Sequence, residues 1–220
     1  MSLPIISHVA NIIDNTPKDR PFVLLEIGAC DGFHSQIFAS ILRIYSKSFI
    51  MHSFEPVGDL ISAWKNWTIH HTEHIKIFNK AVGIVDGQIP FYVSYGGDFY
   101  GSSSIRKPTT HLLDSFTNMK FKQSTAESVR LDTHCKQTGI ESNIIDFIWM
   151  DVQGAERDVF EGGKQTLERT RYIYTEYSDN ECYEGEYNLQ SLLAQLGDDW
   201  MIVQDYGGDV LLKNKNFPVN

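Results

Sequence analysis

Four acidic residues stand at the ends of apolar segments, where a folded chain could bring them to a bound ligand. Glu55 follows the apolar run that ends at Phe54, Asp151 and Glu156 stand in the segment WMDVQGAE, and Glu176 lies in a third apolar run. A carboxylate can accept the proton of an attacking hydroxyl group, and several oxygen ligands together can hold Mg²⁺, Ca²⁺ or Mn²⁺. Which chemistry applies depends on the elements that position these side chains.

Short apolar runs alternate along the chain with segments of helical periodicity. This alternation predicts an open α/β sheet, mostly parallel, with helices on both faces. The final two strands surround Gly207 and Gly208 and predict an antiparallel hairpin at one edge of the sheet. The predicted strands are 22–27, 48–54, 75–78, 144–150, 172–177, 200–203 and 209–212, with a peripheral strand at 89–93, and the predicted helices are 33–45, 57–66, 155–169 and 187–196.

The first predicted strand runs into a glycine-containing loop, EIGACDG (26–32). In sheets of this kind, ligands bind at the carboxyl ends of the strands, and glycines let backbone N–H groups approach a ligand there. The spacing of Gly28 and Gly32 is G-x-x-x-G and lacks the G-x-G-x-x-G of dinucleotide enzymes. The loop therefore favours a ligand other than a pyrophosphate, although many strand–turn–helix junctions contain glycine.

Three further strand ends meet the same predicted edge. Glu55, before Pro56, is placed to accept hydrogen bonds from both hydroxyls of a ribose. The segment Asn79-Lys80-Ala81-Val82 follows the third strand, where either an adenine edge or a plain turn would fit. Asp151 and Glu156 converge beyond the strand 144–150, where they could act chemically, cap the turn or complement the helix dipole.

Composition excludes several classes of protein. The chain has 220 residues, of which 42% are hydrophobic and 21% charged, and it carries a formal charge of −9 without a basic run. These values exclude a disordered or collagen-like chain, and we expect no nucleic-acid partner. Three widely spaced cysteines favour reduced thiols. Since no segment approaches the ~18 to 20 apolar residues of a membrane span and the N-terminus lacks a secretion signal, we expect a cytoplasmic protein without a membrane partner.

The chain is predicted to form a single domain, because it has no internal repeat and no low-complexity tract. Residues 1–20 are expected to be a helical extension at the N-terminus. Residues 95–128 are polar and lack a clear period, and we expect an irregular lid, substrate loop or poorly ordered excursion there. No pattern specifies an oligomeric state.

A series of segments in order resembles the FkbM-type methyltransferases, a Rossmann-like branch of the enzymes that use S-adenosylmethionine. The likeness covers about residues 21–196, and its most specific part is DVQGAE with the Gly162-Gly163 turn. The segments are EIGACDGFHS, FEP, NKAVGIVDGQIPFYV, SSS, VRLDT, DFIWMDVQGAERDVFEGG and YTEYS. The resemblance implies a seven-stranded sheet, S-adenosylmethionine as cofactor, and methylation of a hydroxyl group on a sugar or natural product.

The resemblance also implies roles for individual residues. Glu26, Gly28, Ala29, Asp31 and Gly32 would form the loop under the methionine portion of the cofactor, and Ser35 would meet its carboxylate. Glu55, with Pro56 after it, would bind the ribose, Ala81 and Val82 would lie beside the adenine, and Asp151, Gln153 and Glu156 would border the methyl group and the acceptor. Cys30 and Gln153 depart from the Asn and Glu that are frequent in the family.

Within this hypothesis, either Asp151 or Glu156 is the base that takes the proton of the acceptor hydroxyl. A divalent metal held by Asp151, Glu156 and Glu176 is the less favoured alternative. The competing functions are a non-catalytic cofactor-binding module and an NAD(P)-dependent oxidoreductase. The oxidoreductase would need the three-glycine loop that is missing, and the binding module would not need acids on the acceptor side.

Overall fold

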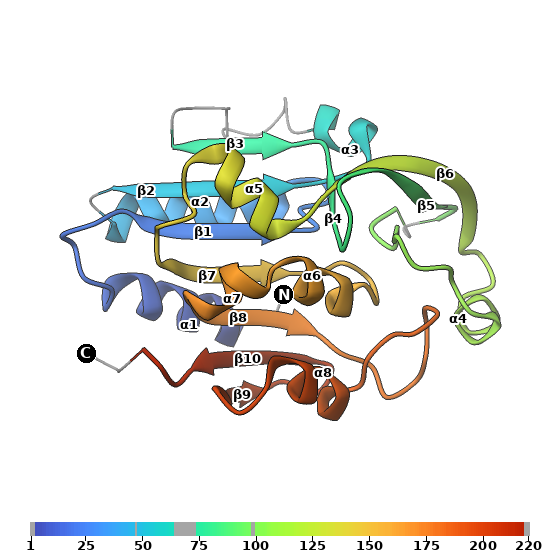
Figure 1. The fold of residues 1–220 in the computed structure, drawn as a ribbon. Helices are drawn as coiled ribbons and strands as arrows, with labels where there is room; N and C mark the ends of the chain where they lie inside the picture. Colours follow the sequence, from blue (N-terminus) through green and yellow to red (C-terminus); the bar gives the residue numbers. More distant parts are fainter. Residues whose placement is uncertain (1–2, 47, 64–73, 98–99, 218–220) are drawn as a thin grey trace.

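A computed structural model describes residues 3–46, 48–63, 74–97 and 100–217. It contains a seven-stranded sheet with the strand order β3-β2-β1-β7-β8-β10-β9 (Figure 1). Neighbours from β3 to β8 are parallel, and β10 is antiparallel to both β8 and β9. The strands are β1 (Phe22–Ile27), β2 (Phe49–Phe54), β3 (Ile75–Phe78), β7 (Ile145–Met150), β8 (Thr170–Glu176), β9 (Trp200–Asp205) and β10 (Asp209–Asn214). The predicted α/β sheet with an antiparallel C-terminal edge hairpin is confirmed.

Helices cover both faces of this sheet (Figure 1). The helices α1 (Leu3–Asp14) and α2 (Phe33–Tyr45) pack on one face. The opposite face carries α5 (Leu131–Thr138), α6 (Glu156–Gly162), α7 (Lys164–Glu168) and α8 (Leu189–Leu196), and α3 (Gly58–Ala63) follows β2.

The central strand β1 shows why its sequence is almost entirely apolar, with Glu26 as the exception. Val23 and Leu25 pack in the core beneath α5 to α8, whereas Phe22 and Leu24 pack in the core beneath α1 and α2. All six residues of β1 are buried. A strand covered by helices on both faces has no solvent side, so its apolar run does not alternate with polar residues.

A second, three-stranded sheet with the order β4-β6-β5 lies beyond the carboxyl ends of β3 and β2 (Figure 1). Its strands are β4 (Ala81–Val82), β5 (Gly87–Tyr95) and β6 (Lys120–Val129), and α4 (Thr110–Ser115) lies between β5 and β6. The expectation that residues 95–128 are irregular is therefore wrong for α4 and for 120–128. Most β6 side chains are exposed, so this strand lacks the apolar alternation that would have identified it.

The helix predicted over 155–169 is interrupted at Gly163, between α6 and α7. A Cβ atom on Gly162 would lie 2.0 Å from the carbonyl oxygen of Gly83. The end of α6 thus packs directly on the backbone that follows β4, an approach that only glycine allows.

The N-terminal segment is part of the main core. Ile5, Val9 and Ile13 of α1 are fully buried. Beyond α1, Arg20 donates to both carboxylate oxygens of the buried Asp146 on β7. Across the described residues, no helix has the combined length and apolar character that crossing a bilayer requires.

Candidate functional site

The loop after β1 packs tightly over the ends of two neighbouring strands. Gly28 has a φ of +87°, and a Cβ atom there would lie 1.7 Å from the carbonyl oxygen of Asp151. The backbone N–H groups of Gly28 and Ala29 both donate to the carbonyl oxygen of Phe54, at 3.1 and 2.9 Å. Glycine at position 28 therefore lets β1, β2 and β7 meet at one point.

Glu55 is fixed at this point by backbone donors. Its Oε2 accepts from the N–H of Cys30 at 2.8 Å, and its Oε1 accepts from the N–H of Val57 at 2.7 Å. Cys30 has a left-handed φ of +51°, which is uncommon outside glycine, asparagine and aspartate. Burial raises the pKa of Glu55 to about 7, although both backbone hydrogen bonds oppose that rise. Each carboxylate oxygen keeps a lone pair for a further donor.

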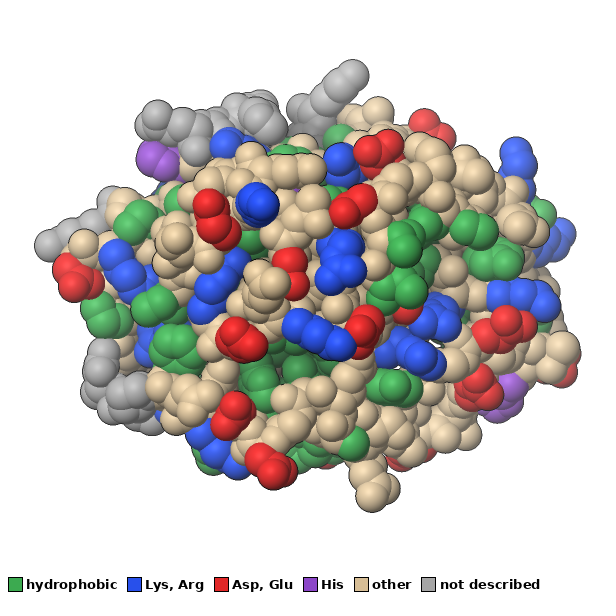
Figure 2. Space-filling model, viewed as in Figure 1, with side chains coloured by type: hydrophobic (Ala, Val, Ile, Leu, Met, Phe, Trp, Pro, Cys, Tyr) green, Lys and Arg blue, Asp and Glu red, His purple; other side chains and the backbone are tan. Residues whose placement is uncertain are grey.

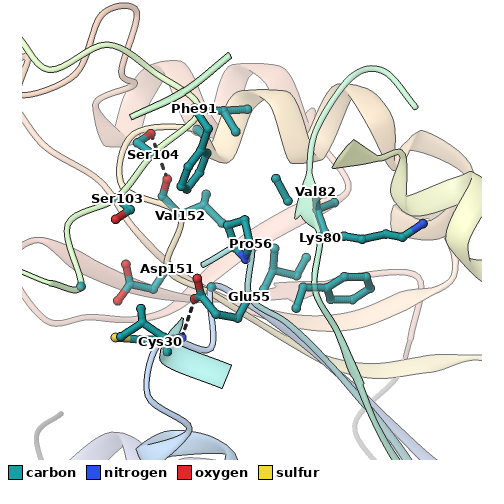
Figure 3. Close-up of a pocket in the computed structure, with 18 of the residues that line it drawn as sticks. Cys30, Glu55, Pro56, Lys80, Val82, Phe91, Ser103, Ser104, Asp151 and Val152 are labelled. Atoms are coloured by element: carbon teal, nitrogen blue, oxygen red, sulfur yellow. Dashed lines mark hydrogen bonds between the residues drawn. The ribbon is translucent and has the colours of Figure 1, made fainter. Parts of the chain in front are cut away.

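Glu55 and Asp151 line the same cavity, and their side chains point into it beside Cys30 (Figure 3). The cavity encloses about 560 Å³ including its open mouth, which is within the usual range for a small-molecule site. Six of the residues predicted to bind the cofactor line it, namely Gly28, Glu55, Pro56, Ala81, Val82 and Asp151.

The other predicted cofactor residues do not line this cavity. Glu26 is buried and accepts hydrogen bonds from the hydroxyls of Ser35 and Ser53, so the Ser35 hydroxyl is directed at a protein carboxylate. Burial raises the pKa of Glu26 to about 7. Asp31 accepts from the N–H of Phe33 at the start of α2. The residues outside the lining are Glu26, Ala29, Asp31, Gly32, Ser35 and Gln153.

One wall of the cavity comes from the second sheet and was not predicted. Backbone bonds between Ser104 and Tyr92 of β5 hold this wall, and the Ser104 hydroxyl donates to the carbonyl oxygen of Gln153 at 2.7 Å. In the sequence, the SSS segment (102–104), which forms part of the resemblance, could have indicated this wall. The wall residues are Phe91, Tyr100, Gly101, Ser103, Ser104 and Ile105. Leu60 and Lys80 line the cavity elsewhere and were not among the residues predicted to bind the cofactor.

Beyond the cavity, Gln153 joins two carboxylates. It adopts a left-handed φ of +55°, and its Nε2 donates to Asp151 Oδ1 at 2.7 Å and to Glu176 Oε2 at 3.1 Å. Asp151 and Glu176 thus accept hydrogen bonds from the same amide group. Burial is the main cause that raises the pKa of both carboxyls, and the charge of Asp151 raises that of Glu176 further. Because two close carboxylates resist a second negative charge, this pair is suited to share one proton.

Glu156 differs from Asp151 in its surroundings. It begins α6, is 3% exposed and is not among the residues that line the cavity. Burial raises its pKa to about 8, and its Oε1 has no hydrogen-bond partner among the described residues. Asp151 thus borders the ligand cavity, whereas Glu156 lies in the protein interior. Within the described part of the chain, no three His, Cys, Asp or Glu side chains are grouped so that they could hold a metal ion.

Comparison with known proteins gives a consistent set of relatives. Residues 26–209 match the sequence model of a family described as Methyltransferase FkbM domain. The chain is 40% identical over 221 residues to 2-O-methyltransferase NoeI of Sinorhizobium fredii (strain NBRC 101917 / NGR234), covering 97% of this chain and 86% of that protein.

Two solved structures are similar at low sequence identity. Methyltransferase FkbM from Methylobacillus flagellatus KT matches with a TM-score of 0.49 and 12% identity, over 88% of this chain. This chain spans 43% of the length of that structure. The O-methyltransferase TomG from Streptomyces achromogenes, solved in complex with SAM, matches with a TM-score of 0.47 and 10% identity, over 97% of this chain and 81% of that one.

Proposed function

This chain belongs to the FkbM family of S-adenosylmethionine-dependent methyltransferases, and from that premise we propose that it methylates a hydroxyl group on a sugar or sugar-like natural product. The observation that carries the proposal is the meeting of Glu55 and Asp151 in one cavity, although 95 positions separate them in the chain. A relative named for 2-O-methylation supports oxygen as the atom that is methylated.

The residues of the cavity fit the cofactor. Glu55 ends β2 with lone pairs free toward the cavity, the arrangement that binds the two hydroxyls of a ribose. Val82 and Phe91 give an apolar wall suited to a flat base. The backbone of Gly28 lines the cavity at its closest approach to Asp151, where a side chain would not fit.

When bound, S-adenosylmethionine supplies an electrophilic methyl group on a positively charged sulfur. In our proposal, Asp151 accepts the proton of the acceptor hydroxyl as its oxygen attacks, since it is the acid that borders both the cavity and the Gln153 amide. Gln153 holds Oδ1 of Asp151, so that Oδ2 is the oxygen directed to the acceptor. The partner carboxyl Glu176 holds the single proton of the pair before transfer, so that Asp151 is ionised and can accept the proton of the hydroxyl, which it then releases to solvent.

Ligand-dependent melting tests the cofactor assignment first. A ligand that binds only the native state raises the melting temperature, and the effect grows with the ligand concentration relative to its Kd. We expect stabilisation by S-adenosylmethionine and S-adenosylhomocysteine and none by NAD. Stabilisation by NAD alone would overturn the assignment and favour the oxidoreductase.

Methyl transfer from labelled cofactor tests the reaction itself. We expect label on neutral glycosides or on small molecules of a cell extract, and the product should carry an O-methyl ether by mass spectrometry and NMR. Cofactor binding without transfer to any acceptor would instead support a non-catalytic binding module. Label found on nitrogen, carbon or sulfur would contradict the proposed O-methylation.

A further inference from the structure

A second cavity lies on the far side of Asp151 from the cofactor cavity. It encloses about 630 Å³ including its open mouth. It is formed by the end of β8, the loop that follows it, the turn before β10 and α4, the group of segments beyond the right-hand end of β8 in Figure 1. Its polar and aromatic lining includes Gln153, Glu176, Tyr177, Tyr183, Glu186 and Asp209.

The two cavities meet at the carboxylate pair described above. Asp151 lines the first cavity. Gln153, which donates to Asp151, and Glu176, which accepts from the same amide group of Gln153, line the second. A methyl group held in the first cavity and a hydroxyl group entering from the second would therefore meet at Asp151. In-line displacement requires this arrangement, since donor and acceptor approach the reacting carbon from opposite sides.

Strand pairing places like charges together in the second cavity. Glu176 and Asp209 are directly opposite in the antiparallel pairing of β8 with β10. Two ionised carboxylates directly opposite each other destabilise a sheet. Burial raises the pKa of Asp209.

A buried carboxyl without a partner lies near the same acids. Glu156 raises the pKa of Glu176 through its charge, and Glu186 and Asp151 raise that of Glu156. Glu156 is 3% exposed, and its Oε1 has no hydrogen-bond partner among the described residues. The acids that line the second cavity itself are Glu176, Glu186 and Asp209, and their carboxyl oxygens are hydrogen-bond acceptors, which favours a ligand rich in hydrogen-bond donors.

The lining also limits the charge of that ligand. None of the described residues that line the second cavity is Lys or Arg, whereas Glu176, Glu186 and Asp209 are acids. A negatively charged group would be repelled by these acids without a compensating cation. Hydroxyl groups can each donate to a carboxylate, and the rings of Tyr177 and Tyr183 offer surfaces for the apolar face of a sugar.

The geometry points to the second cavity as the acceptor site, and to a glycoside ring without negative charge as the acceptor. Glu186 and Asp209 recognise its hydroxyls and exclude uronic acids and phosphorylated sugars. This inference rests on the proposed function, because it uses the cofactor cavity as the source of the methyl group.

Binding measured by saturation-transfer NMR tests the inference without relying on turnover. The probes are methyl glycosides of neutral hexoses and 6-deoxyhexoses, each paired with a uronic acid counterpart, in the presence of S-adenosylhomocysteine. For wild type we expect saturation of at least one neutral glycoside, and a signal at least about tenfold weaker for the uronic acids.

The variant E186Q/D209N removes two charges and keeps the shapes of both side chains. The glutamine introduced by E186Q can still accept from the N–H groups of Cys182 and Tyr183, which Glu186 Oε2 now accepts at 2.7 and 3.1 Å. We expect this variant to bind the uronic acids. The preference for neutral glycosides over uronic acids should fall at least about fivefold, both in NMR binding and in the kcat/KM of labelled transfer. E141Q, which removes one exposed charge before β7 at the opposite edge of the sheet, is the control and should keep the wild-type preference.

The outcomes separate this inference from the function on which it rests. Failure of wild type to bind S-adenosylhomocysteine would defeat the proposed function. Cofactor binding with equal or stronger saturation of uronic acids, or with no contact to any neutral glycoside, would overturn the acceptor class. An unchanged preference in E186Q/D209N, whose folding is checked by its stabilisation with S-adenosylhomocysteine, would overturn the assignment of the second cavity.

Discussion

Asp151 and Glu156 are both buried acids, yet their environments suit them to different roles. Asp151 borders the cofactor cavity and accepts a hydrogen bond from Gln153, whereas Glu156 lies in the interior behind it. A general base must lie within hydrogen-bond reach of the proton that it removes. The surroundings of the two side chains therefore distinguish Asp151 from Glu156, which the sequence segment WMDVQGAE leaves equivalent.

Asp151→Asn should reduce labelled methyl transfer by about 10² to 10⁴-fold, the usual contribution of a general base. The Asn side chain keeps the shape and can still accept from Gln153, so S-adenosylhomocysteine should stabilise the variant nearly as well as wild type. Turnover is measured with labelled cofactor at saturating acceptor. Wild-type turnover in Asp151→Asn would rule out Asp151 as the base.

Glu156→Gln should change the pH dependence of stability more than catalysis. Burial raises the pKa of Glu156 from 4.5 to about 8, so the folded state prefers the protonated carboxyl. The stability that protonated Glu156 contributes to the folded state is complete below the unfolded pKa of 4.5. It is lost as pH rises through the folded pKa of about 8. At about pH 4 the variant should melt near wild type, and by about pH 9 it should be the more stable, on the order of several kcal/mol.

Melting curves across that pH range, with E141Q as a control for the loss of one negative charge, measure the effect. A constant difference between Glu156→Gln and wild type at all pH values would contradict the buried, protonated state of Glu156.

At the scale of elements, the close approach of β1 and β7 depends on one glycine. Gly28→Ala would place a Cβ atom 1.7 Å from the carbonyl oxygen of Asp151, at a φ of +87°. We expect loss of S-adenosylhomocysteine binding and a large fall in melting temperature, because backbone atoms of two strands must separate.

Gly139→Ala is the matched control for this substitution. Gly139 ends α5 at a φ of +75°, but a Cβ atom there meets nothing within 4 Å. Its cost should be limited to backbone strain of about 1 to 2 kcal/mol, with cofactor binding kept. Similar effects of the two substitutions would mean that positive φ alone, and not the contact with Asp151, makes glycine necessary at position 28.

The sequence predicts elements well where burial dictates residue type. β1, β2 and β7 are buried on both faces and are mostly apolar, and Glu55 and Asp151 come directly after such runs. β6 was not predicted from the sequence, because pairing with β5 holds it in place and most of its side chains are exposed to solvent. The cavity wall from Phe91 to Ile105 depends on that pairing, so it could not be placed from residue patterns alone.

The second cavity shows the same limit. Its acids Glu176 and Asp209 become neighbours through the antiparallel register of β8 and β10, and no local pattern fixes that register. Both strands were predicted, and so was the arrival of Glu176 at the ligand edge. The pairing that brings Asp209 beside it required the order of the whole sheet, in which β10 lies between β8 and β9.

At the scale of the whole molecule, buried ionisable groups pull the pH dependence of stability in two directions. Burial raises the pKa values of Glu26 and Glu55 to about 7, which favours folding in acid. Burial also lowers the pKa values of His52 and His134, to about 4 and about 3. These two rings share a hydrogen bond of 2.9 Å beneath α5. As pH falls, the raised pKa values of Glu26 and Glu55 therefore favour the folded state, whereas the lowered pKa values of His52 and His134 favour the unfolded state.

The space-filling view shows that Lys and Arg side chains spread over the face that carries α5 to α8, among acids and apolar groups (Figure 2). The charges that act on the histidine pair are closer. Lys76 lowers the pKa of both rings and Lys80 that of His134, in addition to burial. The remaining neighbours are aromatic, since Phe54 and Phe78 each lie 4.5 Å from His134, centroid to centroid.

The double variant His52→Phe/His134→Leu should therefore lose part of the acid sensitivity of wild type. In the unfolded chain each histidine titrates near 6.5, whereas the folded pair stays neutral until about pH 4. Stability from the neutral pair is present above the unfolded pKa and is lost as pH falls below it. At about pH 5, unfolding of wild type should take up about two more protons than unfolding of the variant.

The measurement is the free energy of unfolding in urea at intervals between about pH 7 and pH 5. Its slope with pH should be steeper in wild type by about 2 to 3 kcal/mol per pH unit. Because both polar partners are replaced together by apolar side chains, the variant should remain folded near neutral pH. Equal slopes in the two proteins would show that the pair is protonated in the folded state, which its burial among Phe54 and Phe78 opposes.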